Sequence, residues 1–319
     1  MKRAQTAALA ALFGSAASLA SAEDVSLRLS WLMNVQSAGY VMALEKGFYA
    51  EEGLNVTIEP GGPNLNSAAL VASGANTFGT NDVIALVNGA AQGMPLQMVG
   101  GCFQRHPAGL IVRADAGIDT PADLVGKNMA YNEGGPWTLV QAMLAANDIA
   151  VSDINTTVST AVELLAEGRV DAKTGFTVNE PLSLAQMGVE TKVLVPSDYG
   201  VNTYAEIVFT SQAYAAEHPG TVAAFMRATQ RGYDYAYENK AETVDTLVKL
   251  NPQLDAVQQT QQLDLQDSYV YTDYARKNGA CAFETSVVAE TAQMLRDITG
   301  LTGEVDLDAI ASTAFLPAK

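Results

Sequence analysis

Basic residues and histidine are scarce in this sequence. Its 319 residues include 18 lysines and arginines against 35 aspartates and glutamates. Binding to nucleic acid or to anionic lipid needs clustered Lys and Arg, so the charge balance disfavours both partners. We interpret the acidity as a source of solubility rather than as an acidic binding face. His106 and His218 are the two histidines, which excludes a metal site built from several histidines.

Cysteine is equally scarce, with Cys102 and Cys281 far apart in the sequence. A disulfide between them and a pair of buried free thiols are both compatible with the sequence, which leaves the choice open. There is no CxxC pair and no spacing of His and Cys that suits a metal. Motifs of activated serine, such as GxSxG or SxxK with its companions, are also missing. We therefore expect no metal, no cofactor and no catalytic residues.

Long apolar runs are missing beyond the N-terminus. Residues 1–22 contain Lys2 and Arg3, an alanine-rich stretch and then the small residues Ala20-Ser21-Ala22. This is the pattern of a cleaved secretory signal peptide. The stretch from Ala4 to Leu19 is too short and too polar for a transmembrane anchor. With no cysteine at the cleavage point to carry a lipid, the sequence predicts a periplasmic protein without a direct membrane anchor.

Short apolar strands alternate with helices that end at glycine, which is typical of an α/β fold with mostly parallel sheets. A second block of the same kind begins at Asp119, where Thr120 is a good N-cap, Pro121 fits the first helical turn and Asp123 lies near the positive helix end. From Glu206 onward the pattern becomes mainly helical. The predicted strands are Leu27 to Trp31, Val56 to Ile58, Leu96 to Phe103, Gly109 to Arg113, Met129 to Asn132, Asn155 to Ser159, Ala172 to Thr177 and Lys192 to Val195. The predicted helices are Ser37 to Gly47, Asn66 to Gly74, Asn81 to Gly93, Trp137 to Asn147, Val162 to Glu167, Leu182 to Met187 and Thr221 to Tyr237.

Four motifs in sequence order carry a family resemblance. They are GYVMALEKGFYAEEGL (39–54), VASGANTFG (71–79), DLVGK (123–127) and LLAEGRVDA (164–172). The sequence from about 20 to 250 resembles the solute-binding proteins of ABC importers, in the branch that binds thiamine pyrimidine precursors, nitrate, taurine and alkanesulfonates. The resemblance implies a monomer that hands a small-molecule solute to an ABC importer permease.

The resemblance also implies a type II periplasmic binding protein fold with two lobes and two hinge crossings. We expect residues 23–113 plus 204–319 in the first lobe and residues 114–203 in the second. The sequence by itself shows two α/β blocks, whereas the return of the C-terminal helices to the first lobe is what the family implies.

Ligands of open α/β sheets bind beyond the carboxyl ends of the strands, so the loops that follow strands are the candidate site. Simpler roles remain open: Trp31 as core filling, Asn66, Asn81 and Asp82 as helix caps, and Glu180 as an exposed or helix-start charge. Arg105 is the candidate anion partner, and Tyr199 either stacks on the ligand or packs at the hinge. The candidates are Trp31, Asn34, Ser37, Asn64, Asn66, Asn81, Asp82, Arg105, Glu133, Gly134, Gly135, Trp137, Asn179, Glu180 and Tyr199.

Aromatic, amide and carboxylate side chains together suit a flat, amino-substituted heterocycle. We expect a thiamine-related aminopyrimidine stacked on Trp31 or Tyr199, with its amino edge at Glu180. A riboflavin-like heterocycle, taurine, an alkanesulfonate or nitrate is the alternative solute. An exported enzyme of pyrimidine metabolism is the alternative of a different class.

Overall fold

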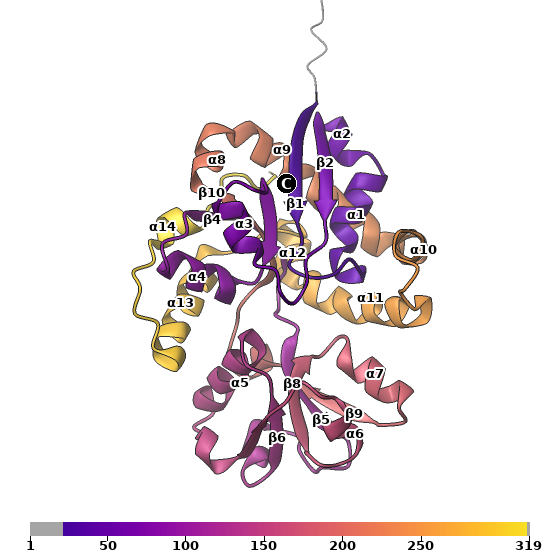
Figure 1. Cartoon of the computed structure of the whole chain (residues 1–319), viewed down its shortest axis with the longest axis vertical. Helices are drawn as coiled ribbons and strands as arrows, with labels where there is room; N and C mark the ends of the chain where they lie inside the picture. The colour runs from indigo at the N-terminus through magenta and orange to yellow at the C-terminus, as the bar shows by residue number, and fades with distance from the viewer. Residues whose placement is uncertain (1–21, 318–319) are drawn as a thin grey trace, which may run out of the picture.

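The computed structural model describes residues 22–317, which form two lobes joined by two crossings of the chain (Figure 1). Each lobe is built around a five-stranded sheet with helices packed against it. The predicted signal peptide, residues 1–22, lies outside the described residues apart from Ala22. Among residues 22–317, no helix has the length and apolar character needed to cross a bilayer.

The first sheet has the strand order β2-β1-β3-β10-β4. Strand β1 pairs in parallel with β2 and β3, whereas β10 pairs antiparallel with both β3 and β4. The sheet is therefore mixed rather than mostly parallel. From Glu206 the chain is mainly helical, as expected, but it begins with strand β10, which the sequence did not predict. Its run of apolar residues is short and buried on both faces, so it has no alternation that marks a strand. The strands are β1 (Glu23–Arg28), β2 (Leu54–Glu59), β3 (Phe78–Asn81), β4 (Leu96–Phe103) and β10 (Ala205–Ser211).

The N-terminal helices of the first lobe follow the predicted pattern closely. Helix α1 (Ala38–Glu45) ends just before Gly47, which has a φ of 74°. Glycine adopts this left-handed conformation without strain. Leu44 is 36% exposed, because the helix packs through its first six residues. These helices are η1 (Val35–Ser37), α1 (Ala38–Glu45), α2 (Phe48–Glu51), α3 (Ser67–Ala72) and α4 (Val83–Ala91).

The second sheet has the order β7-β6-β8-β5-β9. The predicted helix start at Thr120 is confirmed. Asp123 Oδ2 accepts hydrogen bonds from the backbone N–H and the hydroxyl of Thr120, at the start of a 3-10 helix. The strands are β5 (Ala108–Arg113), β6 (Asn128–Tyr131), β7 (Asn155–Val158), β8 (Ala172–Phe176) and β9 (Thr191–Leu194). The helices are η2 (Pro121–Leu124), α5 (Gly135–Ala146), η3 (Val151–Asp153), α6 (Glu163–Ala166), α7 (Glu180–Gln186) and η4 (Pro196–Tyr199).

Strand β5 corrects the expected lobe boundary. It was assigned to the first lobe, with the crossing near Ala114, but it pairs with β8 and β9 of the second sheet. The chain therefore leaves the first lobe through residues 104–107. A strand with five apolar residues in a row is recognisable in the sequence, but nothing local specifies which sheet it joins.

The C-terminal helices pack on the first lobe and reach toward the second (Figure 1). Cys102 and Cys281 form a disulfide, which settles the question that the sequence left open. The backbone N–H of Gly101 also donates to the carbonyl of Cys281 at 2.9 Å, so this segment is tied to β4. The helices are α8 (Gln212–Glu217), α9 (Pro219–Glu238), α10 (Lys240–Leu250), α11 (Ala256–Val270), α12 (Asp273–Asn278), α13 (Thr285–Thr299) and α14 (Leu307–Ile310).

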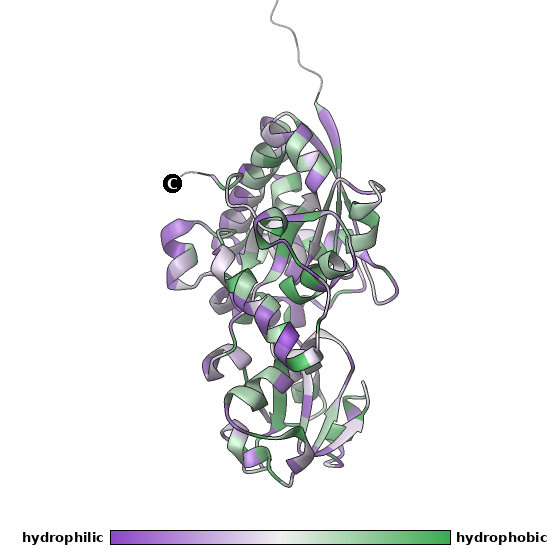
Figure 2. Cartoon of the chain, turned by 90° about the vertical axis from the view of Figure 1, so that its left-hand side faces the viewer, coloured by the Kyte–Doolittle hydropathy of each residue, from purple (hydrophilic) through white to green (hydrophobic). Residues whose placement is uncertain are grey.

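Apolar residues lie along the strands and inner helix faces of both lobes (Figure 2). In the first lobe, α1 crosses α9 at two glycines. A Cβ atom at Gly232 would lie 2.2 Å from the carbonyl oxygen of Gly39 and 2.5 Å from Cβ of Ala43. The buried residues of α9 form a stripe at helical spacing, which includes Val222, Phe225, Thr229, Gly232 and Tyr233.

Gly232→Ala should lower the free energy of unfolding by about 1 to 3 kcal/mol, because the added methyl group overpacks the crossing. Chemical denaturation measures the change. Gly220, in the first turn of the same helix, is the matched control, because a methyl group added there would have no atom within 4 Å. Gly220→Ala should be neutral or stabilise by up to about 1 kcal/mol. Equal effects of the two substitutions would contradict the close crossing.

Candidate ligand-binding site between the lobes

A cavity of about 410 Å³ lies between the lobes, in the size range of small-molecule sites. Its walls come from the loops after β1, β3, β6 and β8, from the first crossing, from the start of β10 and from α11. The principal lining residues are Ser30, Trp31, Asn34, Gln36, Asn81, Asp82, Phe103, His106, Asn132, Thr160, Lys173, Phe176, Asn179, Glu180, Glu206, Gln262 and Gln266.

Six of the sequence-predicted residues line this cavity. The structure brings together Trp31, Asn34, Asn81, Asp82, Asn179 and Glu180. Trp31 is 44% exposed, so it is not core filling and its ring is accessible to a ligand. Two of the six also cap local structure: Asn34 Oδ1 accepts from the N–H of Gln36, and Asp82 Oδ1 accepts from the N–H of Ala85.

The other nine predicted residues do not line the cavity. Ser37 is buried and donates to the carbonyl of Asn34, and Asn66 caps α3 through the N–H of Ala69. Trp137 is buried and stacks on Tyr131, with ring centroids 4.2 Å apart. The remaining residues outside the lining are Asn64, Arg105, Glu133, Gly134, Gly135 and Tyr199.

Arg105 and Tyr199 belong to the hinge rather than to the cavity. Arg105 Nε donates to Ser197 Oγ at 2.8 Å, and its terminal nitrogen donates to Asp198 at 2.6 Å. The guanidinium therefore joins the first crossing to the second and is committed to a carboxylate. Tyr199 directs its hydroxyl to the carbonyl of Asp119. Neither side chain is available as an anion partner or stacking platform at this cavity.

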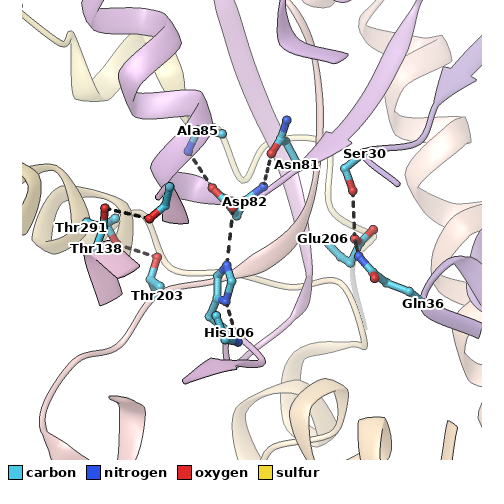
Figure 3. Close-up of polar contacts among 12 residues, drawn as sticks. Ser30, Gln36, Asn81, Asp82, Ala85, His106, Thr138, Thr203, Glu206 and Thr291 are labelled. Carbon is cyan, nitrogen blue, oxygen red and sulfur yellow. Dashed lines mark hydrogen bonds and ion pairs between the residues drawn. The ribbon is translucent and has the colours of Figure 1, made fainter. Parts of the chain in front are cut away.

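Glu206, at the start of β10, is the main cavity residue that the sequence did not reveal. It is 4% exposed and accepts hydrogen bonds from Ser30 Oγ and Gln36 Nε2 (Figure 3). Burial raises the pKa of its carboxyl to about 7, against the opposing effect of these donors. Its φ of 47° is costly for a residue with a Cβ atom, and such strain is concentrated at functional sites. The sequence signal that could have revealed Glu206 was its position as the one acidic residue in the otherwise apolar run AEIVF (205–209).

Asp82 and His106 form a second polar contact at the cavity wall (Figure 3). His106 Nδ1 accepts from the N–H of Ala108 at 3.0 Å, so in the neutral ring the proton is assigned to Nε2. That nitrogen lies 3.6 Å from Asp82 Oδ2. The contact connects the start of α4 to the first crossing, so it places the first-lobe wall relative to the hinge.

The second lobe contributes a lysine and a glutamate. Lys173 is 3% exposed, and burial lowers its pKa. Glu180 Oε2 accepts from the N–H of Phe176 at 3.0 Å. Burial raises the pKa of Glu180, while backbone donors and Lys173 oppose the rise. The wall of this lobe therefore presents both a donor and an acceptor to the cavity.

Helix α11 carries a row of buried glutamines, of which Gln262 and Gln266 line the cavity. Gln259, Gln262 and Gln266 recur at helical spacing and are at most 5% exposed. Gln259 Oε1 accepts from the N–H of Val35 at 3.1 Å, whereas Gln266 Oε1 has no hydrogen-bond partner among the described residues. The sequence signal was a polar stripe with a helical period, which resembles an ordinary solvated face.

The arrangement suits binding of a polar, planar molecule. Trp31, Phe103 and Phe176 offer aromatic surface, and the carboxyl, amide and ammonium groups offer donors and acceptors. Within residues 22–317, no group of three or more His, Cys, Asp or Glu side chains is placed to hold a metal ion.

Comparisons with known proteins identify a family model and several named relatives that are similar to this chain. A family model described as NMT1/THI5 like matches residues 34–243. The riboflavin-binding protein RibY of Chloroflexus aurantiacus is 27% identical over 92% of this chain and 86% of its own length. The formylaminopyrimidine-binding protein of Halalkalibacterium halodurans is 30% identical over 71% of this chain and 70% of its own. A 4-amino-5-hydroxymethyl-2-methylpyrimidine phosphate synthase of Legionella pneumophila is 29% identical, covering 72% and 74%.

Solved structures share the fold. The periplasmic aliphatic sulphonate binding protein SsuA from Escherichia coli superposes with a TM-score of 0.72 at 16% identity. The match covers 90% of this chain and 96% of that chain. The two-lobed periplasmic binding protein fold expected from the sequence is thereby confirmed.

The raised pKa of Glu206 predicts a stability that falls as the pH rises. Between pH 4.5, the ordinary value, and about 7, the folded protein keeps a proton that the unfolded chain has lost. Each pH unit in this window should lower the free energy of unfolding by about 1.4 kcal/mol, or about 3 kcal/mol in total. Glu206→Gln removes the titrating group and should remove this component.

Denaturation of the wild type and of Glu206→Gln at pH 4.5, 6 and 8 measures the difference between their profiles. The two free energies should diverge with rising pH in favour of the variant. Parallel profiles would show that the carboxyl titrates normally.

Proposed function

The chain belongs to the NMT1/THI5-like family, and from this premise we propose that it is the solute-binding subunit of an ABC importer that captures a thiamine-related aminopyrimidine. The observation that carries the proposal is one cavity lined from both lobes, with an accessible aromatic ring and buried carboxyl groups. Closure of the lobes would shield the solute from water, and reopening would release it to a permease.

Two kinds of relative support this class of solute. The relatives named for binding formylaminopyrimidine and riboflavin both bind flat nitrogen heterocycles, according to their names. An aminopyrimidine presents an amino donor beside a ring nitrogen acceptor. A carboxyl group in protonated form can serve both, and as a carboxylate it can accept from the amino group. Glu180 and Glu206 are the carboxyl groups available on the second and first lobe.

Glu180 remains the proposed partner of the amino edge. Its Oε2 atom accepts from the N–H of Phe176, which fixes the side chain, and Oε1 is the oxygen proposed to accept from the ligand. Glu206 already receives two hydrogen bonds from Ser30 and Gln36. Trp31 is the proposed stacking platform, because Tyr199 lies away from the cavity.

Small anions fit the cavity less well. The arginine expected to bind an anion is paired with Asp198 at the hinge. Three carboxyl groups, those of Asp82, Glu180 and Glu206, line the cavity instead. Repulsion by carboxylates and the lack of a bidentate guanidinium both disfavour sulfonate or nitrate.

An enzyme of pyrimidine metabolism is the second candidate, because several relatives are named as pyrimidine phosphate synthases. A turnover assay that yields a modified pyrimidine would favour it. The predicted signal peptide favours transport instead, because it would deliver the protein to the periplasm.

Glu180→Gln should weaken binding of an aminopyrimidine by about one to two decades. The change keeps the shape, removes a charged acceptor and places an amide near the ligand amino group. For an anion the same change should help or have no effect. Calorimetry of both proteins with hydroxymethylpyrimidine, formylaminopyrimidine, riboflavin, taurine and nitrate separates these cases.

Glu133→Gln is the matched control, because Glu133 is an exposed glutamate in the second lobe outside the cavity lining. It should bind as the wild type does. Tight binding of a sulfonate, or unchanged pyrimidine binding by Glu180→Gln, would defeat the ligand assignment.

A further inference from the structure

Lys173 is buried at the cavity wall in an unusual setting. It is the second residue of β8, where its register neighbours are Ile111 on β5 and Ala130 on β6. Those two residues belong to an apolar cluster with Leu165 and Leu184 under α6 and α7. The lysine stem thus extends along an apolar layer of the second lobe, and the side chain reaches the cavity.

The ammonium group has few partners. It donates to the carbonyl oxygen of Thr174 at 2.9 Å, which uses one of its three N–H bonds. Glu180 favours its charged form by electrostatic attraction, but among the described residues no ion pair or hydrogen bond joins the two groups. A buried charge with unused donors is costly unless a further acceptor is supplied.

The rest of the cavity points to the source of that acceptor. Lys173 is the one lysine in the cavity lining, which contains no arginine among the described residues. Carboxyl groups and the unpartnered Gln266 Oε1 provide acceptors elsewhere on the wall. A bound solute that carried donors alone would satisfy those acceptors and leave the ammonium unsatisfied.

We propose that Lys173 is a specificity-determining residue whose ammonium binds an oxygen acceptor of the solute. The inference rests on the proposed solute-binding function and deepens it: the heterocycle carries a carbonyl or anionic oxygen in addition to its amino edge. A formamide, a ring carbonyl and a phosphate share this chemistry, and the test distinguishes them. A lysine that only filled space would be replaceable by a neutral side chain of similar length.

Lys173→Met keeps the unbranched stem and removes the donors. Its affinity for formylaminopyrimidine should fall by about one to two decades, because a charged hydrogen bond is lost. Its affinity for 4-amino-2,5-dimethylpyrimidine, which has no oxygen, should stay within about threefold of the wild type. Riboflavin and hydroxymethylpyrimidine phosphate, titrated in parallel by calorimetry, show whether a ring carbonyl or a phosphate is the preferred acceptor.

Lys192→Met on strand β9 of the same sheet is the matched control, because Lys192 lies at the surface and pairs with Asp119. It should leave every affinity unchanged. If Lys173→Met lowers the affinity for both pyrimidines equally, the proposal is overturned, since the ammonium would then not bind the oxygen of the solute.

Thermal melting without ligand gives a second readout. A ligand-binding ammonium stabilises nothing in the empty protein, so Lys173→Met should melt at or above the wild-type temperature. A large drop in melting temperature would assign Lys173 a structural role and overturn the proposal. If no pyrimidine binds the wild type, the proposed solute is wrong, and the melting result still decides between these two roles.

Discussion

The fold depends on the insertion of β10 into the first sheet between β3 and β4. This strand follows the whole second lobe in sequence but pairs with both of these earlier strands. The chain must therefore leave the first lobe and return to it. This creates two crossings, and the cleft lies between the two lobes that they join. The same insertion places Glu206, at the start of β10, on the cleft wall beside Ser30 and Gln36. Topology and site are thus consequences of one pairing.

The site is built from polar groups that the protein buries without satisfying fully. Glu206 is held at a strained backbone angle, Lys173 has one acceptor, and Gln266 Oε1 has none among the described residues. Each feature costs stability in the empty protein, and a ligand with matching donors and acceptors offsets that cost. The cleft therefore favours a heterocycle with mixed hydrogen-bonding groups over a compact anion.

The sequence predicted the α/β lobes, the family and the approximate ends of the seven helices to which it gave bounds, because glycine stops, N-caps and apolar runs of regular length are local signals. It did not predict the sheet that β5 joins, since strand partners are chosen by long-range packing. It also did not predict strands β3 and β10, which are short, largely buried and without the alternation that marks a strand. Trp31, Asn81 and Glu180 were predicted as cavity residues because each lies at the end of a strand or within a few residues after it. Glu206, Lys173 and Gln266 were missed because each belongs to a strand or helix. The sequence pattern does not show whether a polar residue in such an element faces the cavity or the solvent. Tyr199 and Arg105 were wrongly predicted to line the cavity. They lie at the hinge, and polar and aromatic residues of the same types occur in hinges and in ligand-binding clefts.

Small-angle X-ray scattering of the protein with and without its solute tests the central claim most directly. If the lobes close on the ligand, the radius of gyration should decrease when a binding aminopyrimidine is added, and a non-binding analogue should leave it unchanged. Saturated binding without any contraction would contradict the account, because the solute would then be held without the movement that shields and releases it.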